Sequence, residues 1–419
     1  EQIRQIRHTF LDNIYRQENT SLGYWETRNK TLQDVQAILG EPLGTGLQSI
    51  MNQFWDAWQE LSKEPDSLTV RALVVQRGES LVNYINHLGG QLDKLQSDLN
   101  SELKVRIDEV NQLTKQIAEL NLKIMKNEVT GDSANDYRDQ RNLLVDKLTK
   151  LVNVDIFENE FGSMTITLGG YFLVNNDKST DLYAGYKENN GQFYVPMLEG
   201  TELEVPIGNG ILKGLLESRG VENETGNTNN IVSVLKKQLN TLVQTLVNEV
   251  NSLHRQGKTL DNPPQDGQDF FVAINPKKPL EMGNIKLNPI FSESNGLNYI
   301  VASKDGAPGD NTIALKMANL RHVPFIADAG NILSMDDYYR SIILDIGTKG
   351  SEAESITESQ AKLVQSADSN RQAISGVSLD EEMSNMMKFK FAYDASSRVI
   401  NVIDEMIATI INRMGIVGR

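Results

Sequence analysis

Apolar residues in the C-terminal segment, residues 375–419, recur at helical spacing along two adjacent stripes. Ser378 and Glu381 have the spacing of a capping box, and acidic residues at 380–382 fill the first turn, where the helix dipole favours negative charge. The two stripes together are too wide for a two-helix seam, so we expect this helix to need several neighbours. The expected assembly interface is Leu379, Met383, Met386, Met387, Phe389, Phe391, Tyr393, Val399, Ile400, Ile403, Met406, Ile407 and Ile410.

The longest periodic segment predicts a rod-forming helix from Leu68 to Asn127. Its apolar residues follow one another in steps of three and four, the spacing of a coiled-coil seam. At about 1.5 Å per residue, such a helix would be roughly 60–90 Å long. We expect Gly89–Gly90 to bend it without ending it. The seam consists of Leu81, Ile85, Leu88, Leu92, Leu95, Leu99, Leu103, Ile107, Val110, Leu113, Ile117, Leu120 and Ile124.

Shorter helices are predicted on both sides of this rod, whereas the apolar residues at positions 4–19 are too irregularly spaced to assign. Trp55 and Trp58 lie on a broad apolar face, and we expect them to anchor the core rather than to line a ligand site. The predicted helices are 22–39, 47–61, 135–154, 212–219, 227–254, 312–320, 335–346 and 352–374.

The pattern changes at Asp155. Between Asp155 and Pro206 it alternates with period two and is rich in β-branched and aromatic residues around glycines, which predicts a small antiparallel β unit. Residues 270–303 give a mixed strand and loop signal with several prolines. Helices therefore precede and follow a β-rich middle region.

This order predicts a mainly α fold with β insertions, in which helices from both ends of the chain form an elongated antiparallel bundle or coiled coil. We expect a helical rod domain from residues 1–260 and 321–374, with the small β unit at 155–206 inside it. Residues 261–320 would be an inserted β-rich outer domain, and residues 375–419 would be the C-terminal assembly helix.

The composition narrows the classes of partner and chemistry. The chain has 41 basic and 56 acidic side chains and a formal net charge of -15, which argues against nucleic acid and against an anionic membrane surface. It has no cysteine, which excludes disulfides, thiolate zinc sites and a cysteine nucleophile. The sequence contains no apolar run near the roughly 20 residues of a membrane span and no apolar signal-peptide core at its start.

We predict no catalytic residues, no metal and no cofactor. The histidines, His8, His87, His254 and His322, lack the spacing of a helical metal pair, and His254 is expected to be hydrogen-bonded. The glycines at 208–214 do not form a dinucleotide-binding motif, and the acidic residues at 261–269 do not have the spacing of a calcium loop. The dense charges at 136–141 are expected to form salt bridges between helices.

Five stretches of the chain resemble one family. SGVSLDEEMSNMMKFKFAYDASSRVINVIDEMIATII, from Ser375 onward, resembles the shared C-terminal motif of bacterial flagellar rod, hook and hook-associated axial proteins. Four further stretches are similar to the hook-associated protein 1 family of the first hook–filament junction, and they occur in the family's order over nearly the whole chain. They are Phe10–Arg28, Phe54–Arg71, Tyr137–Ile156, and Val250–Asp261 followed by Asp269–Phe271.

The resemblance implies an extracellular structural protein of the flagellum, exported by the flagellar type III pathway without a cleaved signal peptide. It implies self-assembly into a ring through terminal helices, next to the hook protein and the second hook–filament junction protein, and an export chaperone before assembly. It also implies an N-terminal helix that would lie before the first residue of this sequence, so we expect an N-terminal truncation, and a reduced outer domain.

Other interpretations remain open at this point. Within the flagellum, the chain could be another axial protein, such as the second junction protein or a flagellin-like protein. Outside that system, it could be an enzyme carried on a helical scaffold or a secreted coiled-coil adhesin.

Overall fold

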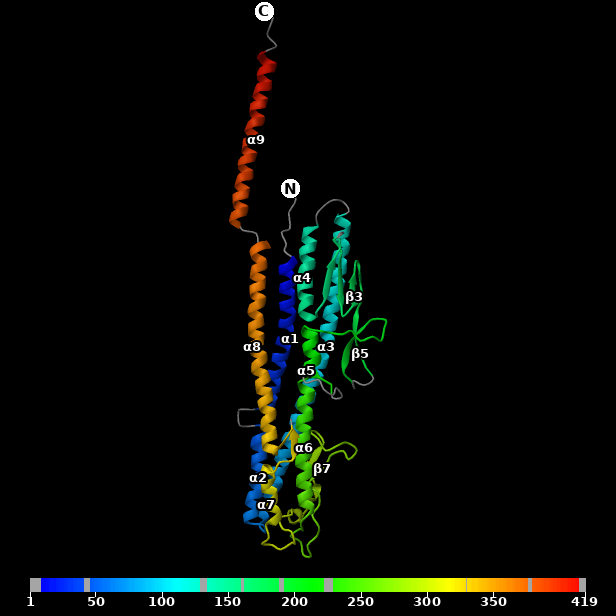
Figure 1. The fold of residues 1–419 in the computed structure, drawn as a ribbon, viewed down its shortest axis with the longest axis vertical. Coiled ribbons are helices and arrows are strands. Elements are labelled where there is room, and N and C mark those ends of the chain that lie inside the picture. Colours follow the sequence, from blue (N-terminus) through cyan, green and yellow to red (C-terminus); the bar gives the residue numbers. More distant parts are fainter. Residues whose placement is uncertain are drawn as a thin grey trace, which may run out of the picture.

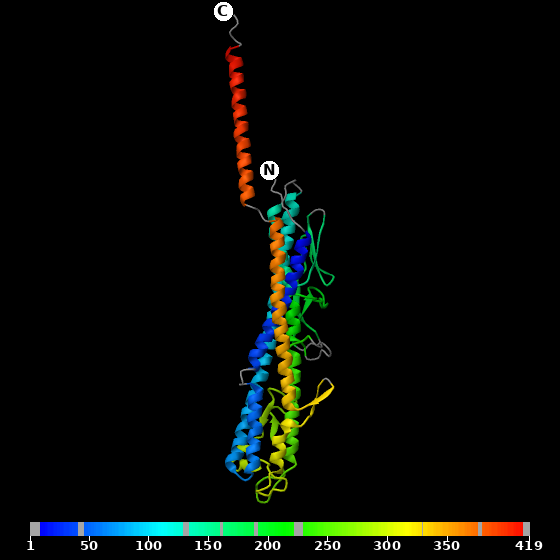
Figure 2. The same ribbon diagram turned by 60° about the vertical axis from the view of Figure 1, so that its left-hand side comes forward.

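The computed structural model is a long, narrow bundle of helices, and it describes residues 9–40, 46–128, 134–159, 162–187, 192–221, 229–328, 330–375 and 379–413 (Figure 1). α1 (Thr9–Leu39) runs down the bundle and α3 (Leu68–Glu128) runs back up. α4 (Asn135–Leu151), α5 (Ile211–Arg219) and α6 (Val232–Arg255) then descend one after another. α8 (Met335–Ser375) ascends beside α1, so an early and a late helix pack antiparallel (Figure 2). This confirms the predicted elongated antiparallel bundle with β insertions.

Two small β units lie against α3 within the predicted range of 155–206. β1 (Asp155–Glu158), β2 (Met164–Leu168), β3 (Tyr171–Asn175) and β4 (Lys178–Ser179) form an antiparallel sheet in that order, and β5 (Leu182–Tyr186) pairs with β6 (Tyr194–Leu198). Asparagines on α3 tie both units to the rod. Asn121 donates to the Met164 carbonyl at 2.7 Å, and Asn111 donates to the Leu182 carbonyl at 2.7 Å.

The lower end of the bundle is built around aromatic side chains. Trp55 and Trp58 of α2 (Leu47–Lys63) are buried, which confirms the prediction that they anchor the core. The ring of Trp58 lies 5.6 Å from that of Phe270, and Phe54 lies 6.0 Å from the same ring. Around this cluster lie β7 (Phe271–Ala273), β8 (Ile285–Leu287), η1 (Pro289–Ser292), η2 (Gly296–Tyr299), α7 (Thr312–Asn319) and η3 (Leu320–His322).

The range 261–320, expected to be an inserted β-rich domain, thus contains one pair of three-residue strands and several short helices. Phe270 and Phe271 bring this range into the aromatic core of α2. The division of the chain into a rod, an inserted domain and an assembly helix stays a prediction.

Two helices are longer than the sequence pattern predicts. α1 begins at Thr9 rather than near residue 22, because its first half buries polar residues such as Asp12, Arg16 and Asn19, which the apolar pattern does not count. α8 is one helix through residues 347–351, where two were predicted. Gly350 sits directly against Gln36 of α1, since a Cβ there would lie 2.4 Å from the Gln36 amide nitrogen. α3 continues through Gly89–Gly90, as predicted.

The hairpin of β9 (Ile326–Asp328) and β10 (Asn331–Leu333) was not predicted from the sequence, because each strand has only three residues. It projects from the bundle as the yellow hairpin in Figure 2. Within the described parts of the chain, no helix has the length and apolar character that crossing a bilayer requires.

Candidate assembly surface

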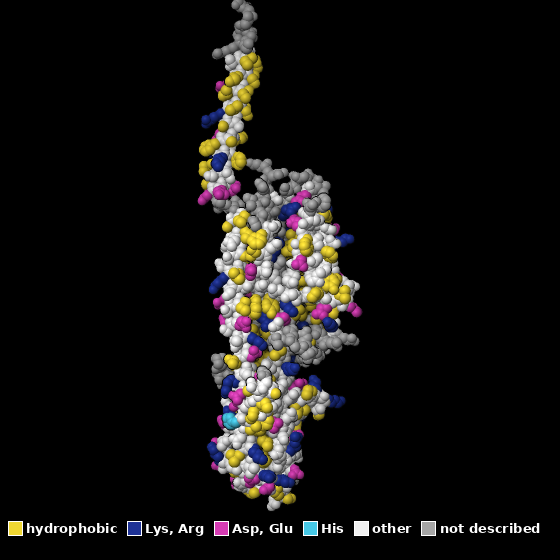
Figure 3. Space-filling view, in the orientation of Figure 1, with side chains coloured by type: hydrophobic (Ala, Val, Ile, Leu, Met, Phe, Trp, Pro, Cys, Tyr) yellow, Lys and Arg dark blue, Asp and Glu magenta, His cyan; other side chains and the backbone are white. Residues whose placement is uncertain are grey.

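α9 (Leu379–Arg413) projects beyond the body of the molecule (Figures 1 and 2). Every side chain from Asp380 to Asn412 is exposed, and Figure 3 shows hydrophobic side chains along the length of the helix. Phe389 is 65% exposed and Tyr393 is 75% exposed, whereas large aromatic side chains are mostly buried in folded proteins. The helix therefore carries a large apolar surface that no described part of this chain covers.

The predicted interface residues from Met383 to Ile410 all lie on this exposed helix, each at least 48% exposed. The side chain of Leu379 lies outside what the structure describes, as does the capping residue Ser378. The structure adds Val402, 47% exposed, and Ile411, 68% exposed, to the same surface. Val402 follows Val399 by three residues and Ile411 follows Ile407 by four, so helical periodicity predicts both.

The C-terminal half of α9 has a distinct polar face. Arg398, Asp404 and Glu405 are spaced so that they share one side of the helix, and apolar residues occupy the remainder. An apolar surface this wide can contact more than one neighbouring helix.

A buried ionic cluster fastens the end of α8, just before α9, to α1 and α4. Asp146 of α4 accepts from Arg16 of α1 at 2.9 Å and from Arg371 of α8 at 2.5 Å. Burial alone would lower the pKa of Arg371, but the carboxylates of Asp146 and Asp368 outweigh it, and the pKa is raised. The Arg371 guanidinium also lies 4.1 Å from the centre of the Tyr15 ring. Three helices are therefore joined at the base of the projecting helix.

A second ionic cluster joins α1 to α5. Glu217 accepts from the Tyr24 hydroxyl at 2.5 Å and from Arg28 at 3.1 Å, and Arg28 also donates to the Asn229 carbonyl at 2.8 Å. Burial and the hydrogen bond to Glu217 raise the pKa of Tyr24, so the phenol stays protonated and donates.

Within the charged segment 136–141, Arg138 forms the predicted interhelical salt bridge, and Arg141 pairs with a strand instead. Arg138 of α4 pairs with Glu128 of α3 at 2.8 Å, and both Arg138 and Arg141 pair with Glu158 of β1 at 2.6 Å. Arg141 is fully buried and donates to Asn121 at 2.8 Å. These contacts hold the top of α3, α4 and the sheet together.

The other candidate residues have structural roles. His254 is buried, and its ring accepts from the Val301 N–H at 3.0 Å, which confirms it as a hydrogen-bonded histidine. The acidic residues of 261–269 are turned to separate partners, Asp266 to Lys258 and Asp269 to Arg255. The described residues hold no group of three or more His, Cys, Asp or Glu side chains placed to bind a metal ion.

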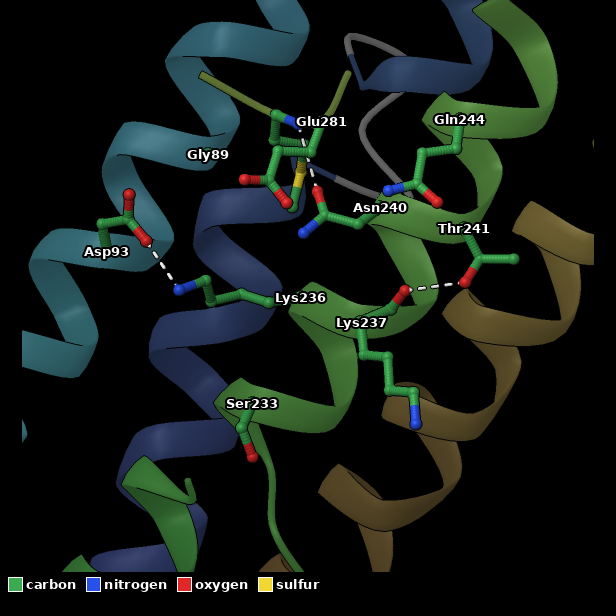
Figure 4. A pocket seen from close by; sticks show the side chains of 10 residues that line it. Gly89, Asp93, Ser233, Lys236, Lys237, Asn240, Thr241, Gln244 and Glu281 are labelled. Carbon is green, nitrogen blue, oxygen red and sulfur yellow. Dashed lines mark hydrogen bonds and ion pairs between the residues drawn. The ribbon is translucent and has the colours of Figure 1, made fainter. Parts of the chain in front are cut away.

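Two hollows mark the lower body. A polar cleft of about 530 Å³ lies between α3 and α6, where Asp93 pairs with Lys236 at 2.7 Å (Figure 4). An apolar groove of about 820 Å³ lies between α1 and α8, lined in part by Leu39, Ile343 and Leu344. Neither hollow is predictable from the sequence pattern, because both form between segments far apart in the chain.

The comparisons with known proteins agree over the whole chain. The family model described as the flagellar hook-associated protein FlgK helical domain matches residues 32–271, which is more than half of the sequence. The chain is also 31% identical, over 440 residues, to flagellar hook-associated protein 1 of Bacillus subtilis (strain 168), covering 100% of this chain and 86% of that relative. The chain belongs to the flagellar hook-associated protein 1 family.

Two further relatives are less similar in sequence. The flagellar hook-associated protein 1 of Escherichia coli (strain K12) is 21% identical over 491 residues, covering 96% of this chain and 87% of that relative. The flagellar hook junction protein FlgK from Burkholderia pseudomallei has the same fold, with a TM-score of 0.72 at 14% identity, over 88% of this chain and 100% of that one.

A second family model, the flagellar basal body rod FlgEFG protein C-terminal, matches residues 372–414. This range starts in the last turn of α8 and covers all of α9. The exposed helix is therefore similar to the C-terminal part of basal body rod proteins as well as to the hook-associated protein 1 family. Membership of the hook-associated protein 1 family favours the first-junction interpretation over the second junction protein and flagellin.

Proposed function

We propose that this chain is a structural protein of the bacterial flagellum, placed between hook and filament, and that it assembles through α9. The observation that carries the proposal is the apolar face of α9, exposed along its length in a member of the hook-associated protein 1 family. Its match to the C-terminal model of rod proteins supports a role shared by axial components.

The physical reason is the free energy of covering that face. Burying one large apolar side chain contributes about 1.5–3 kcal/mol. Burying the interface residues of α9, even partly, would contribute more free energy than the association of the chains costs. The stabilisation from packing α9 would then come mainly at the assembly step. The body of the subunit would be stable without it.

The partners follow from this placement. Copies of the chain would form a ring, with the hook protein on one side and the second hook–filament junction protein on the other. Before assembly, a flagellar export chaperone would cover α9, since an exposed apolar helix promotes aggregation. The route would be the flagellar type III pathway, and the site of action would be the extracellular flagellum. Neither nucleic acid nor membrane is a partner in this proposal.

The ionic cluster of Arg371, Asp146 and Arg16 would give the assembly its mechanical continuity. Force applied to α9 would be transmitted to α8. The contact of Arg371 with Asp146, which also pairs with Arg16, would distribute that force to α4 and α1. Buried charge-assisted contacts of this kind are costly to break.

The test is deletion of residues 379–413 in flagellated cells that lack their own junction protein. We expect the shortened chain to unfold with the same cooperative transition as the full chain, because the core lies outside α9. We also expect it to leave hooks without filaments and to release flagellin into the medium, whereas the full chain restores filaments. Filaments assembled on hooks by the shortened chain would overturn the proposal.

A further inference from the structure

The loop between β7 and β8, residues 274–284, is a rigid projection on the lower body (Figure 1). The buried side chain of Asn284 organises it from within. Its amide donates to the carbonyls of Asn275 at 3.2 Å, Lys278 at 3.2 Å and Pro279 at 2.8 Å. Its oxygen accepts from the Asn275 N–H at 2.7 Å.

The base of the loop is fastened to two helices. The Met282 N–H donates to Asn240 of α6 at 3.1 Å (Figure 4), and the Gly283 N–H donates to Asn86 of α3 at 2.9 Å. Met282 also sits directly on Gly89, where an added Cβ would lie 2.7 Å from the Met282 Cβ. A loop held in one conformation loses little entropy when it binds, which is typical of a recognition loop.

This loop presents the exposed side chains of Ile274, Lys277 and Lys278. Ile274 is 52% exposed. Lys277 and Lys278 are exposed, and neither has an ion pair with any residue that the structure describes. Figure 3 shows basic side chains at the tip of the projection. The loop thus offers two positive charges beside an apolar side chain, on a chain whose net charge is -15.

The groove between α1 and α8 has the complementary character. Leu344 on its wall is 69% exposed, and Gly347 has open space where a Cβ would be. Glu352 lines the groove, and Glu354 and Glu358 follow it on α8. All three are exposed and without an ion pair among the described residues, and no basic residue occurs between Lys349 and Lys362.

The loop cannot reach the groove of its own chain. Figure 1 shows α8 along one edge of the bundle and the loop projecting from the opposite side, at the level of the lower half of α8. When two copies stand side by side in the same orientation, the loop of one copy faces the α8 edge of the next. A contact between two different surfaces of identical chains repeats around a ring or helix.

We propose that the β7–β8 loop of one copy docks into the α1–α8 groove of its neighbour. Lys277 and Lys278 would pair with the glutamates that begin at Glu352, and Ile274 would contact the apolar wall at Leu344. This contact rests on the proposed assembly, but it places a second interface on the body, separate from α9. It would set the lateral order of the subunits, since charge complementarity fixes register and partner more than affinity.

The absence of cysteine allows a direct test. Cells lacking their own junction protein would carry the chain with Lys278→Cys and Glu352→Cys, and isolated flagella would be treated with a short bismaleimide. Each subunit then has one thiol on each side of the proposed contact, so we expect a ladder of dimers and larger oligomers. The matched control is Lys94→Cys with Glu352→Cys, because Lys94 is exposed on α3 outside both surfaces.

Charge variants sharpen the result. On the doubly substituted chain, Lys277→Glu should lower the ladder yield severalfold, and a further Glu354→Lys should restore it. If the doubly substituted chain is present in flagella and its ladder does not exceed that of the control, the loop-to-groove contact is wrong. If even the unsubstituted chain is absent from the flagella, the proposed function fails instead.

Discussion

His254 illustrates how a single buried side chain fixes the lower body. The Val301 N–H donates to its Nε2 at 3.0 Å, so Nε2 carries no proton, and Nδ1 must donate to the Gln268 carbonyl. Burial lowers the pKa of His254 from 6.5 to about 4, because the charged ring would lose its hydration and would meet the Val301 donor. The neutral tautomer therefore joins α6 to two segments of the lower body.

We predict a specific pH dependence from this histidine. Below its ordinary pKa of 6.5 the unfolded chain binds a proton that the folded chain does not bind until about pH 4. The free energy of unfolding should thus be complete above pH 6.5 and fall between pH 6.5 and 4, by about 3 kcal/mol at most. His254→Gln should remove this part of the pH dependence, whereas His87→Gln, at an exposed position, should not. Denaturant unfolding of the unsubstituted chain and of both variants at pH 7 and pH 5 gives the change in the free energy of unfolding between the two pH values. An equal change in all three chains would contradict the prediction.

At the residue scale, sequence reasoning succeeded where the side chain has one common use. Buried tryptophans and a hydrogen-bonded histidine are ordinary outcomes for Trp55, Trp58 and His254. The contact between Asp146 and Arg371 could not be predicted, because the two residues are separated by 225 positions. A sequence pattern predicts that charged residues lie on a solvated face, because it does not show which distant residues the fold brings next to them.

At the scale of elements, the paired glycines in α3 show why a helix can tolerate glycine. Gly89 lies against Met282, and its missing side chain admits the base of the β7–β8 loop. Gly90 is exposed, with nothing within 4 Å of a Cβ, so it gives the helix only the conformational cost of glycine. Adjacent residues of one type therefore have opposite roles.

We predict opposite effects of the same substitution at these two positions. Gly90→Ala should raise the free energy of unfolding by up to about 1 kcal/mol, because alanine favours the helix. Gly89→Ala should lower it, since the new Cβ would lie 2.7 Å from the Cβ of Met282. Thermal and denaturant unfolding of the two single variants decides this. Stabilisation by Gly89→Ala equal to that of Gly90→Ala would show that the loop does not rest on α3.

Element prediction from sequence was limited by what periodicity measures. The predicted seam of α3 is buried except for Leu95, which is partly buried. The first half of α1 buries Arg16 and Asn19, and its apolar residues show no regular spacing. The sequence pattern predicts two helices in place of α8, because Gly347 and Gly350 disfavour a helix. α8 is nevertheless continuous, and Gly350 packs against α1. Tertiary contacts, absent from the sequence pattern, decided both cases.

At the scale of the molecule, the chain combines a body that has a buried core with a helix, α9, whose apolar residues are exposed. The body is closed by an aromatic core and by buried ionic clusters, whereas α9 leaves its apolar residues exposed. The width of this face could be predicted from the sequence, because it is a local periodic feature. The α1–α8 groove and the β7–β8 loop could not, because each depends on where distant segments meet.

The accessibility of α9 to a thiol reagent, measured before and after assembly, shows whether α9 is the assembly surface. Single thiols at Phe389→Cys and Ile403→Cys can be labelled without background, because the chain has no cysteine. Glu202→Cys, at an exposed position after β6, is the control. We predict that both α9 thiols react rapidly in the purified chain and at least about tenfold more slowly in isolated flagella, since tight packing excludes the reagent. Equal rates in the purified chain and in flagella would contradict the assignment of α9 as the assembly surface.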